Sequence, residues 1–197
     1  MAEGLKIDAK RTAVLSMDLQ NGIVRAYLQD QTEMVGRAAQ VLHAARAAGA
    51  MVMHVRVGFR PGLPEVSSRN ALFGAVKSSP ERLKMFEGDG SEIDSRLGPE
   101  AGDIVVTKKR ISAFAGSDLA MLLRANEIDT LVMFGVATSG VVLSTLLEAS
   151  DMDYRLVVVE DCCADREAEL HAALMEKLFA QRATVVKAAE VVAALAG

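Results

Sequence analysis

The sequence has few of the residues that cross-link or rigidify a chain. Its 197 residues include two cysteines, four prolines, no tryptophan and only 4% aromatic residues. The cysteines, Cys162 and Cys163, are adjacent, so they cannot connect distant segments and a disulfide framework is excluded. A chain without disulfides is typical of a reducing compartment, and we therefore expect a cytoplasmic protein.

Long apolar runs and basic clusters are also missing. No stretch of 18 apolar residues occurs, which argues against a transmembrane helix, and residues 1–11 lack the apolar centre of a secretory signal. The 22 basic and 26 acidic residues give a net charge of −4, and no long run of lysine and arginine is present. We therefore expect neither nucleic acid nor a membrane surface as a partner.

What the sequence does contain is enough apolar material for one compact unit. Its 51% hydrophobic content excludes intrinsic disorder, and its length fits a single domain over residues 1–197. Six short apolar runs alternate with amphipathic segments, a pattern typical of parallel strands covered by helices on both faces. The runs lie at 13–17, 51–57, 103–107, 130–136, 155–159 and 183–186. We predict a three-layer, Rossmann-like α/β/α domain with a six-stranded, mainly parallel sheet.

One segment interrupts this alternation. Residues 58–102 contain all four prolines and seven of the fifteen glycines, without a strong strand or a long helix. A stretch of this length inside a compact domain is usually functional or disordered. Because it also carries many apolar residues, we expect an ordered excursion with short helical turns, serving as a lid or an oligomer contact. A plain surface loop is the alternative.

Charged residues follow two of the predicted strands. Asp18 comes directly after the run 13–17, and Lys108 follows the run 103–107. Ligands of parallel sheets bind beyond the carboxyl ends of the strands, so these side chains are candidates for a catalytic pair. A carboxylate beside an ammonium group stays ionised and suits acid–base chemistry on a small molecule. A purely structural salt bridge is the alternative.

A turn rich in small residues follows the run 130–136. It comprises Val136, Ala137, Thr138 and Ser139, and it leads into a predicted helix from about residue 139 to residue 150. Backbone N–H groups at such a turn can hold an anion or a developing oxyanion. The turn lacks the lysine of a phosphate-binding P-loop and the glycine spacing of a dinucleotide site.

Three ordered motifs carry a family resemblance. They are residues 13–22 (AVLSMDLQNG), residues 105–108 followed by 112–119 (VVTK, then SAFAGSDL), and residues 135–138 with 141–145 (GVAT, then VVLST). Together they resemble the isochorismatase-like hydrolase superfamily, also called cysteine hydrolases, which includes nicotinamidases and N-carbamoyl amidohydrolases. The resemblance implies the isochorismatase-like α/β/α fold and hydrolysis of a small molecule.

The resemblance also implies a catalytic triad of aspartate, lysine and cysteine. Asp18 matches the aspartate, and Lys108 matches the lysine, with Lys109 as an alternative register. The position of the cysteine, six residues after Gly135, is occupied by Val141, which has no nucleophilic atom. Isochorismatases proper also lack the cysteine, but they carry glycine there. A thioester route is therefore closed at this position.

Two readings of this departure remain open. The chain is a hydrolase that cleaves an amide, carbamate or enol-ether bond with the Asp/Lys pair and water. Alternatively, it is a catalytically impaired member that binds a small carboxylate or amide, or serves as an assembly subunit. Ser139 and Thr138 are further candidates for a substitute nucleophile, and we expect Cys162 and Cys163 to be buried core residues.

The resemblance implies several further features. A cis peptide would join Val136 to Ala137, and the N–H groups of Ala137 and Val141 would form an oxyanion hole. The residues expected to line the substrate pocket are Gln20, Phe59, Arg60, Phe73 and Phe114. The three histidines, His43, His54 and His171, are too scattered for a metal site, so we expect no metal and no cofactor. Family members are commonly homodimers or homotetramers, and we expect the same here.

Overall fold

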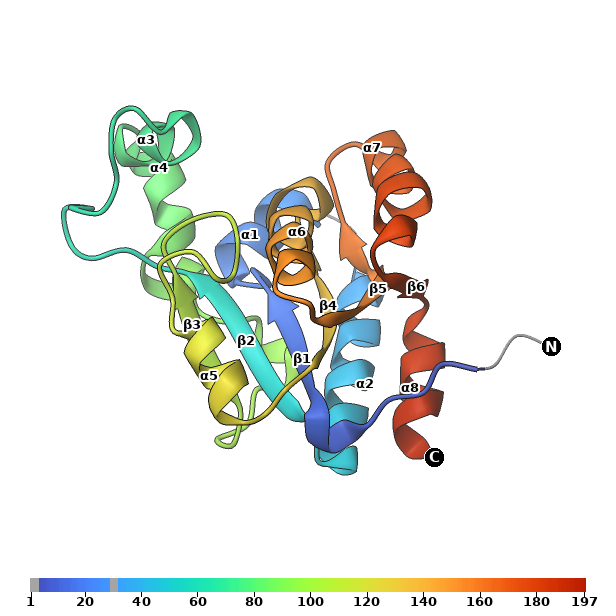
Figure 1. Cartoon of the computed structure of the whole chain (residues 1–197). Coiled ribbons are helices and arrows are strands. Elements are labelled where there is room, and N and C mark those ends of the chain that lie inside the picture. The colour runs from blue at the N-terminus through green and yellow to red at the C-terminus, as the bar shows by residue number, and fades with distance from the viewer. Residues whose placement is uncertain (1–3, 29–31) are drawn as a thin grey trace.

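A six-stranded, entirely parallel sheet forms the centre of the computed structural model, which describes residues 4–28 and 32–197 (Figure 1). The strands are β1 (Thr12–Met17), β2 (Met51–Val57), β3 (Ile104–Lys108), β4 (Thr130–Val136), β5 (Arg155–Ala164) and β6 (Thr184–Val186). Their order is β3-β2-β1-β4-β5-β6, so the topological switch point lies between β1 and β4. The predicted fold class is confirmed.

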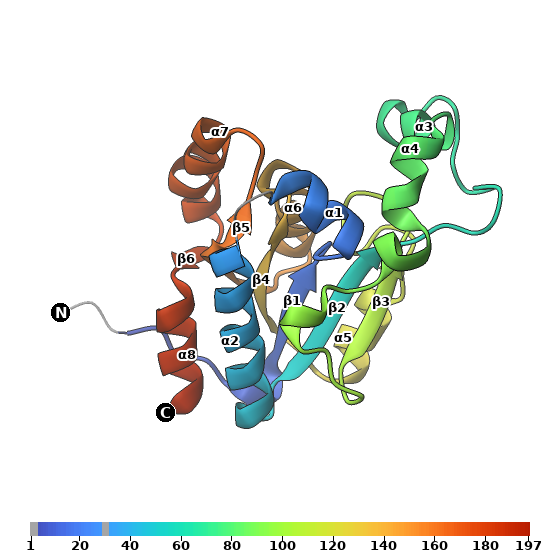
Figure 2. The same ribbon diagram turned by 180° about the vertical axis from the view of Figure 1, so that it is seen from behind.

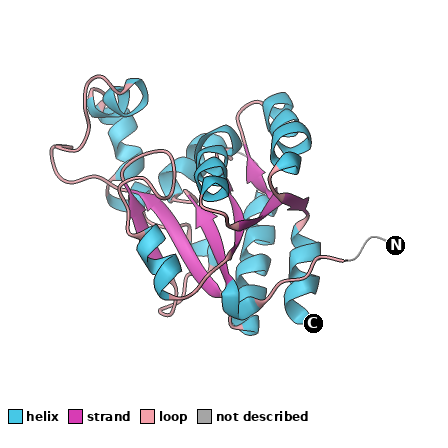
Figure 3. Cartoon of the chain, in the orientation of Figure 1, coloured by secondary structure: helices cyan, strands magenta, loops and turns pink. Residues whose placement is uncertain are grey.

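Helices cover both faces of the sheet (Figures 2 and 3). They are α1 (Asn21–Tyr27), α2 (Thr32–Ala48), α3 (Ala71–Lys77), α4 (Pro80–Leu83), α5 (Leu119–Ala125), α6 (Leu143–Asp151), α7 (Ala168–Ala173) and α8 (Ala188–Ala196). Helices α5 and α6 lie on one face, and α2 and α8 lie on the other. No helix of the described residues is both long enough and apolar enough to cross a bilayer.

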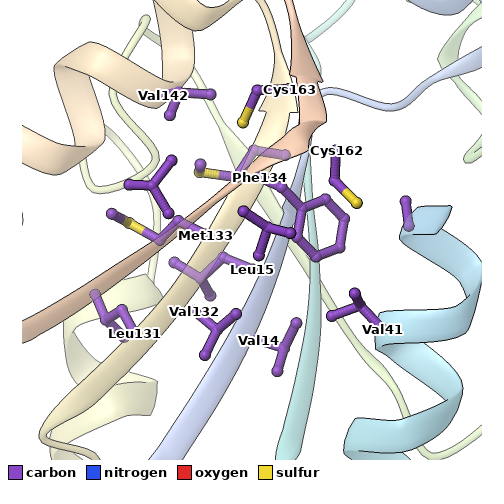
Figure 4. Close-up of a cluster of buried hydrophobic side chains, with 14 of the residues drawn as sticks. Val14, Leu15, Val41, Leu131, Val132, Met133, Phe134, Val142, Cys162 and Cys163 are labelled. Atoms are coloured by element: carbon purple, nitrogen blue, oxygen red, sulfur yellow. The ribbon is translucent and has the colours of Figure 1, made fainter. Parts of the chain in front are cut away.

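The core is continuous across the sheet because the two central strands, β1 and β4, are buried along their whole length. Side chains alternate between the faces of a strand, so each strand contributes to both layers. Figure 4 shows the ring of Phe134 on the side of Val41 from α2, with Leu131 on the opposite side. This requirement for apolar residues on both faces explains why the strands read as nearly continuous hydrophobic runs.

Strand β5 continues five residues beyond its predicted end at Val159. Cys162 and Cys163 therefore lie inside the strand, and both are buried. Burial raises the pKa of both thiols, that of Cys163 to about 12. A thiol in this state is a small core residue and a poor nucleophile, as expected for both cysteines.

The excursion over residues 58–102 is ordered and contains only short helical segments, as predicted. Helices α3 and α4 stand beyond the carboxyl ends of the strands (Figure 1). A second, smaller hydrophobic core holds this segment against the sheet; it consists of Val57, Leu63, Val66, Phe73 and Val76. The excursion therefore forms a wall above the end of the sheet where a ligand of a parallel sheet binds.

Candidate active site

Asp18 stands where β1 leaves the sheet. Its φ of +56° turns the chain out of the strand direction, and its N–H donates to the carbonyl of Val55 at 2.8 Å. The side chain is buried and forms an ion pair with Lys108, whose Nζ lies 2.9 Å from Asp18 Oδ2. Lys108 ends β3, so the ion pair reaches across the intervening strand β2.

Lys108 has no N–H group left for another partner. Besides Asp18, its Nζ donates to the carbonyls of Arg110 at 3.0 Å and Ile111 at 2.7 Å. An ammonium group has three N–H donors, so all three are engaged and the positive charge is fixed in place. Lys109 points elsewhere and donates to the carbonyl of Gly58 at 2.6 Å. The structure thus places Lys108, rather than Lys109, beside the carboxylate.

The second carboxylate oxygen of Asp18 differs from the first in its hydrogen bonding. Asp18 Oδ1 is buried and has no hydrogen-bond partner in the described structure. Burial raises the pKa of Asp18, and the neighbouring Lys108 charge offsets part of that rise. A buried, unpaired carboxylate oxygen costs free energy, so its presence calls for an explanation. It is suited to exchange a proton with a bound molecule.

A cavity of about 420 Å³ lies at this end of the sheet, with Asp18 and Lys108 among its lining residues. Helix α1, the excursion, the turn after β4 and the segment after β5 contribute most of the remaining walls, together with Val57 of β2 and Ile111 after β3. Two larger hollows, of about 670 and 480 Å³, lie at the opposite end, where the strands begin. The smaller cavity is the candidate site, because it alone of the three contains the Asp–Lys pair at the carboxyl ends of the strands.

Of the five residues expected to line the pocket, Phe73 does so. Contrary to the prediction, the other four do not; they are Gln20, Phe59, Arg60 and Phe114. Phe59 packs edge-on against the ring of Phe73, with centroids 5.5 Å apart. Arg60 extends into solvent, and Phe114 stacks on Tyr154, with centroids 6.3 Å apart. Sequence order alone does not reveal which side of an irregular segment faces inward.

Gln20 has a structural role instead. Its Nε2 donates to the carbonyls of Val57 at 3.0 Å and Ser91 at 3.1 Å, and its Oε1 accepts from Val57 N–H at 2.8 Å. The fully buried amide therefore fastens the end of β2 and the excursion together. The same segment is also held by Arg25, whose guanidinium pairs with Asp89.

Replacing Gln20 by leucine should destabilise the protein. The change leaves the buried N–H and C=O groups of Val57 without their partner, and each such group costs about 1–3 kcal/mol. We expect a loss of about 2–6 kcal/mol in the free energy of unfolding, measured by urea denaturation. Gln40→Leu, at an exposed position of α2, is the matched control and should change stability by less than about 0.5 kcal/mol. Equal stability of the two variants would contradict the proposed structural role of the Gln20 hydrogen bonds.

The turn after β4 begins at Gly135. A Cβ on this residue would lie 2.0 Å from the carbonyl oxygen of Met17, so only glycine fits between β4 and β1. The peptide bond between Val136 and Ala137 is cis, as the resemblance implies. Val136, Ala137 and Val141 all line the cavity, and Val141 is 2% exposed.

Thr138 and Ser139 are held from the other side of the turn. Thr138 Oγ1 is 2.8 Å from His171 Nδ1, and Ser139 N–H donates to Asp165 Oδ2 at 2.7 Å. Neither Thr138 nor Ser139 lines the cavity. Asp165 does not cap the following helix, because α7 begins only after Glu167. The Asp165 carboxylate instead accepts hydrogen bonds from the backbone N–H groups of Ser139 and Arg166.

The three histidines lie on three different elements, β2, α7 and α2. His54 is buried, with its Nε2 3.1 Å from Asp103 Oδ2, and burial lowers the pKa of its imidazole. His171 contacts the turn, and His43 lies on α2. Within residues 4–28 and 32–197, no three side chains of His, Cys, Asp and Glu come together as potential metal ligands.

Comparisons with known proteins agree with this architecture. The sequence model of the isochorismatase domain family matches residues 12–190 of this chain, and the chain belongs to this family. It is 32% identical over 193 residues to the isochorismatase family protein YecD of Escherichia coli O157:H7, covering 97% of this chain and 100% of the relative. It is 30% identical over 169 residues to maleamate amidohydrolase of Pseudomonas putida, covering 83% and 77%.

A solved structure of an isochorismatase family protein from Burkholderia thailandensis superposes with a TM-score of 0.84. The two chains share 30% sequence identity, and the superposition covers 98% of each. The similarity therefore extends over the sheet, the helices and the excursion as one unit.

Proposed function

We propose that the chain is a hydrolase that cleaves a C–N bond of a small amide or carbamate without a covalent intermediate. The observation that carries the proposal is Asp18, which is buried at the cavity with one oxygen paired to Lys108 and the other without a partner among the described residues. Similarity to a maleamate amidohydrolase supports an amide as the reacting group.

In the proposed reaction, water is the attacking group. Asp18 Oδ1 accepts a proton from water as the water oxygen bonds to the carbonyl carbon. The oxyanion that forms is stabilised by the N–H groups of Ala137 and Val141 and by the fixed charge of Lys108. Collapse of the intermediate breaks the C–N bond, and Asp18 returns its proton to the leaving nitrogen. Atoms and charge balance without any bond to the protein.

The side chains around the cavity support water over a protein nucleophile. Val141 stands at the position of the family cysteine and is a hydrocarbon. Thr138 and Ser139 are engaged with the segment after β5 rather than with the cavity. Cys162 is buried in β5, where its raised pKa disfavours the thiolate.

Two alternatives have some support. The raised pKa of Asp18 favours a protonated carboxyl group, which is the acid needed to cleave an enol ether. Val141 is compatible with a catalytically impaired member that binds a small carboxylate or amide, or acts as an assembly subunit.

A panel of small amides, carbamates and enol ethers separates these readings. Hydrolysis of C–N substrates that disappears in Asp18→Ala is the expected result. Hydrolysis of enol ethers alone would replace the proposal with the second candidate. Ligand binding with no turnover of any compound would favour the non-catalytic reading.

The pH profile provides an independent prediction. A general base must be ionised, so kcat/KM should fall as the pH decreases through the pKa of Asp18. Because burial raises that pKa, the midpoint of the fall should lie above the ordinary aspartate value of about 3.9. Initial rates between pH 4 and 9 provide the measurement, in buffers of constant ionic strength. Activity lost with rising pH would instead indicate that Asp18 acts as an acid.

From the resemblance to the isochorismatase family we also propose a single domain over residues 1–197. We propose that this domain forms a homodimer or homotetramer and is located in the cytoplasm. Several large apolar side chains are exposed, including Met121 of α5 and Leu147 of α6. They are compatible with a contact between copies of the chain.

A further inference from the structure

The ammonium group of Lys108 is oriented by a loop as well as by Asp18. Two of its three N–H groups donate to the carbonyls of Arg110 and Ile111, at 3.0 and 2.7 Å. Both carbonyls belong to the loop over residues 109–118, which connects β3 to α5 through bends and turns. The location of the positive charge therefore depends on what holds this loop.

Helix α6 holds the loop through two of its side chains. The Ser112 hydroxyl donates to the carboxylate of Glu148. The N–H of Ala113 donates to Thr145 Oγ1 at 2.9 Å. Thr145 and Glu148 are three residues apart in α6, so they lie on one side of the helix. Ser112 and Thr145 are buried, and hydrogen bonds are stronger where water is excluded.

Contacts on the other side of the loop reach the excursion. Lys109 Nζ donates to the carbonyl of Gly58 at 2.6 Å, and Arg110 Nη2 donates to the carbonyl of Glu65 at 2.8 Å. Each of these contacts is made by the end of a long side chain. By contrast, α6 binds the loop backbone itself at Ala113.

Helix α6 also continues from one wall of the candidate active site. The turn over Thr138–Val142, which includes Val141, leads directly into Leu143, the first residue of α6. Neither Thr145 nor Glu148 lines the cavity. The helix therefore connects the turn after β4 with the loop that orients Lys108, and it sets where these two parts of the site lie relative to each other.

We propose that Thr145 and Glu148 are positioning residues for Lys108. By holding the loop, they fix the two carbonyls that direct its ammonium group toward Asp18. The inference rests on the proposed function for the role of the ammonium group at the oxyanion, whereas its effect on the ion pair with Asp18 does not depend on any reaction. If the contacts with α6 only stabilised the fold, their loss would change stability alone.

The titration of Asp18 tests the proposal without a substrate. Carbon-13 NMR of the aspartate carboxyl groups in the full chain gives its pKa, and the signal is assigned by its absence in Asp18→Asn. The charge of Lys108 lowers the pKa of Asp18, so displacement of the ammonium group should raise the titration midpoint. We expect a rise of about 0.5–1 pH unit in both Thr145→Val and Glu148→Ala.

Conservative variants separate position from charge and from stability. Thr145→Ser keeps the hydroxyl and Glu148→Gln keeps an acceptor, so neither should raise the midpoint. Loss of the negative charge of Glu148 would by itself lower the pKa of Asp18, so a rise in Glu148→Ala reports the ammonium group. Thr130→Val removes a hydroxyl that donates to Asp129 at the start of β4, and it controls for destabilisation.

The remaining charged side chains of the cavity are unchanged in these variants. Besides Asp18 and Lys108, the charged residues among the described lining are Arg82 and Arg166. A raised midpoint is therefore assigned to Lys108.

Kinetics provide a second measurement. With the best amide substrate, Thr145→Val and Glu148→Ala should lower kcat about 10- to 100-fold, because a misplaced charge stabilises the oxyanion less well. The change in KM should stay within about threefold, since neither residue lines the cavity.

Several outcomes would overturn the proposal. These are an unchanged or lower midpoint in either disruptive variant with the protein folded, or an equal rise in Thr130→Val. Where a helix variant does not fold, Ser112→Ala breaks the contact with Glu148 from the loop side and must raise the midpoint. If the wild-type chain hydrolyses no amide, the proposed function fails, while raised midpoints still support the positioning role.

Discussion

Replacing Asp18 by asparagine is expected to lower kcat for the best amide substrate by about 10²–10⁴-fold, the range that a positioned acid–base group contributes. Asparagine keeps the shape of the side chain, and its amide oxygen can still accept from Lys108 Nζ, now 2.9 Å from Asp18 Oδ2. What is lost is the oxygen that takes up a proton. Initial rates give kcat, and a thermal melt of the same preparation gives the melting temperature.

Asp103→Asn is the matched control for this experiment. The side chain of Asp103, just before β3, is also largely covered, at 5% exposure, but it pairs with Arg46 through Nε–Oδ1 at 3.0 Å and Nη2–Oδ2 at 2.6 Å. Removing its charge should lower the melting temperature and leave kcat unchanged, because breaking a buried pair leaves a charge uncompensated. The account of Asp18 would be wrong if Asp18→Asn turned over substrate at the wild-type rate.

Replacing Val141 by cysteine is expected to create a covalent route. The introduced thiol would line the cavity that also contains the carboxylate of Asp18. It would also lie within the turn that leads into α6, where a thiolate is favoured. We expect alkylation by iodoacetamide, an acyl adduct visible by intact mass, and amide hydrolysis accelerated about tenfold or more.

Val142→Cys controls for the presence of an extra thiol. Val142 is the next residue, is fully buried and does not line the cavity. Its thiol should resist iodoacetamide and leave the rate unchanged. If Val141→Cys behaved in the same way, position 141 would not be where a nucleophile meets the substrate.

Much of the fold could be predicted because a doubly covered strand must be apolar on both faces. The end of β5 was missed because Glu160 and Asp161 look like a strand terminus. In the fold both are paired with the start of α8: Glu160 lies 2.8 Å from Lys187 Nζ, and Asp161 accepts from Ala188 N–H at 2.8 Å. Partners distant in sequence allow polar residues to continue the strand.

The candidate site also has a part that the sequence could predict and a part that it could not. Asp18 and Lys108 could be placed together because both follow strands of one sheet, and the chain direction fixes where such ends meet. The walls could not be predicted, because they depend on how irregular segments pack. Tyr27 belongs to α1, a helix of seven residues that leaves a weak periodic signal, and Arg82 belongs to a helix of four.

The central claim is that water activated by Asp18 attacks the substrate directly. The most direct measurement is turnover of the best amide substrate in ¹⁸O-labelled water, with product and intact protein followed by mass spectrometry at short times. The account predicts one ¹⁸O atom in the new carboxylate and no change in the mass of the protein at any time. An acyl adduct on the wild-type protein during turnover would contradict it.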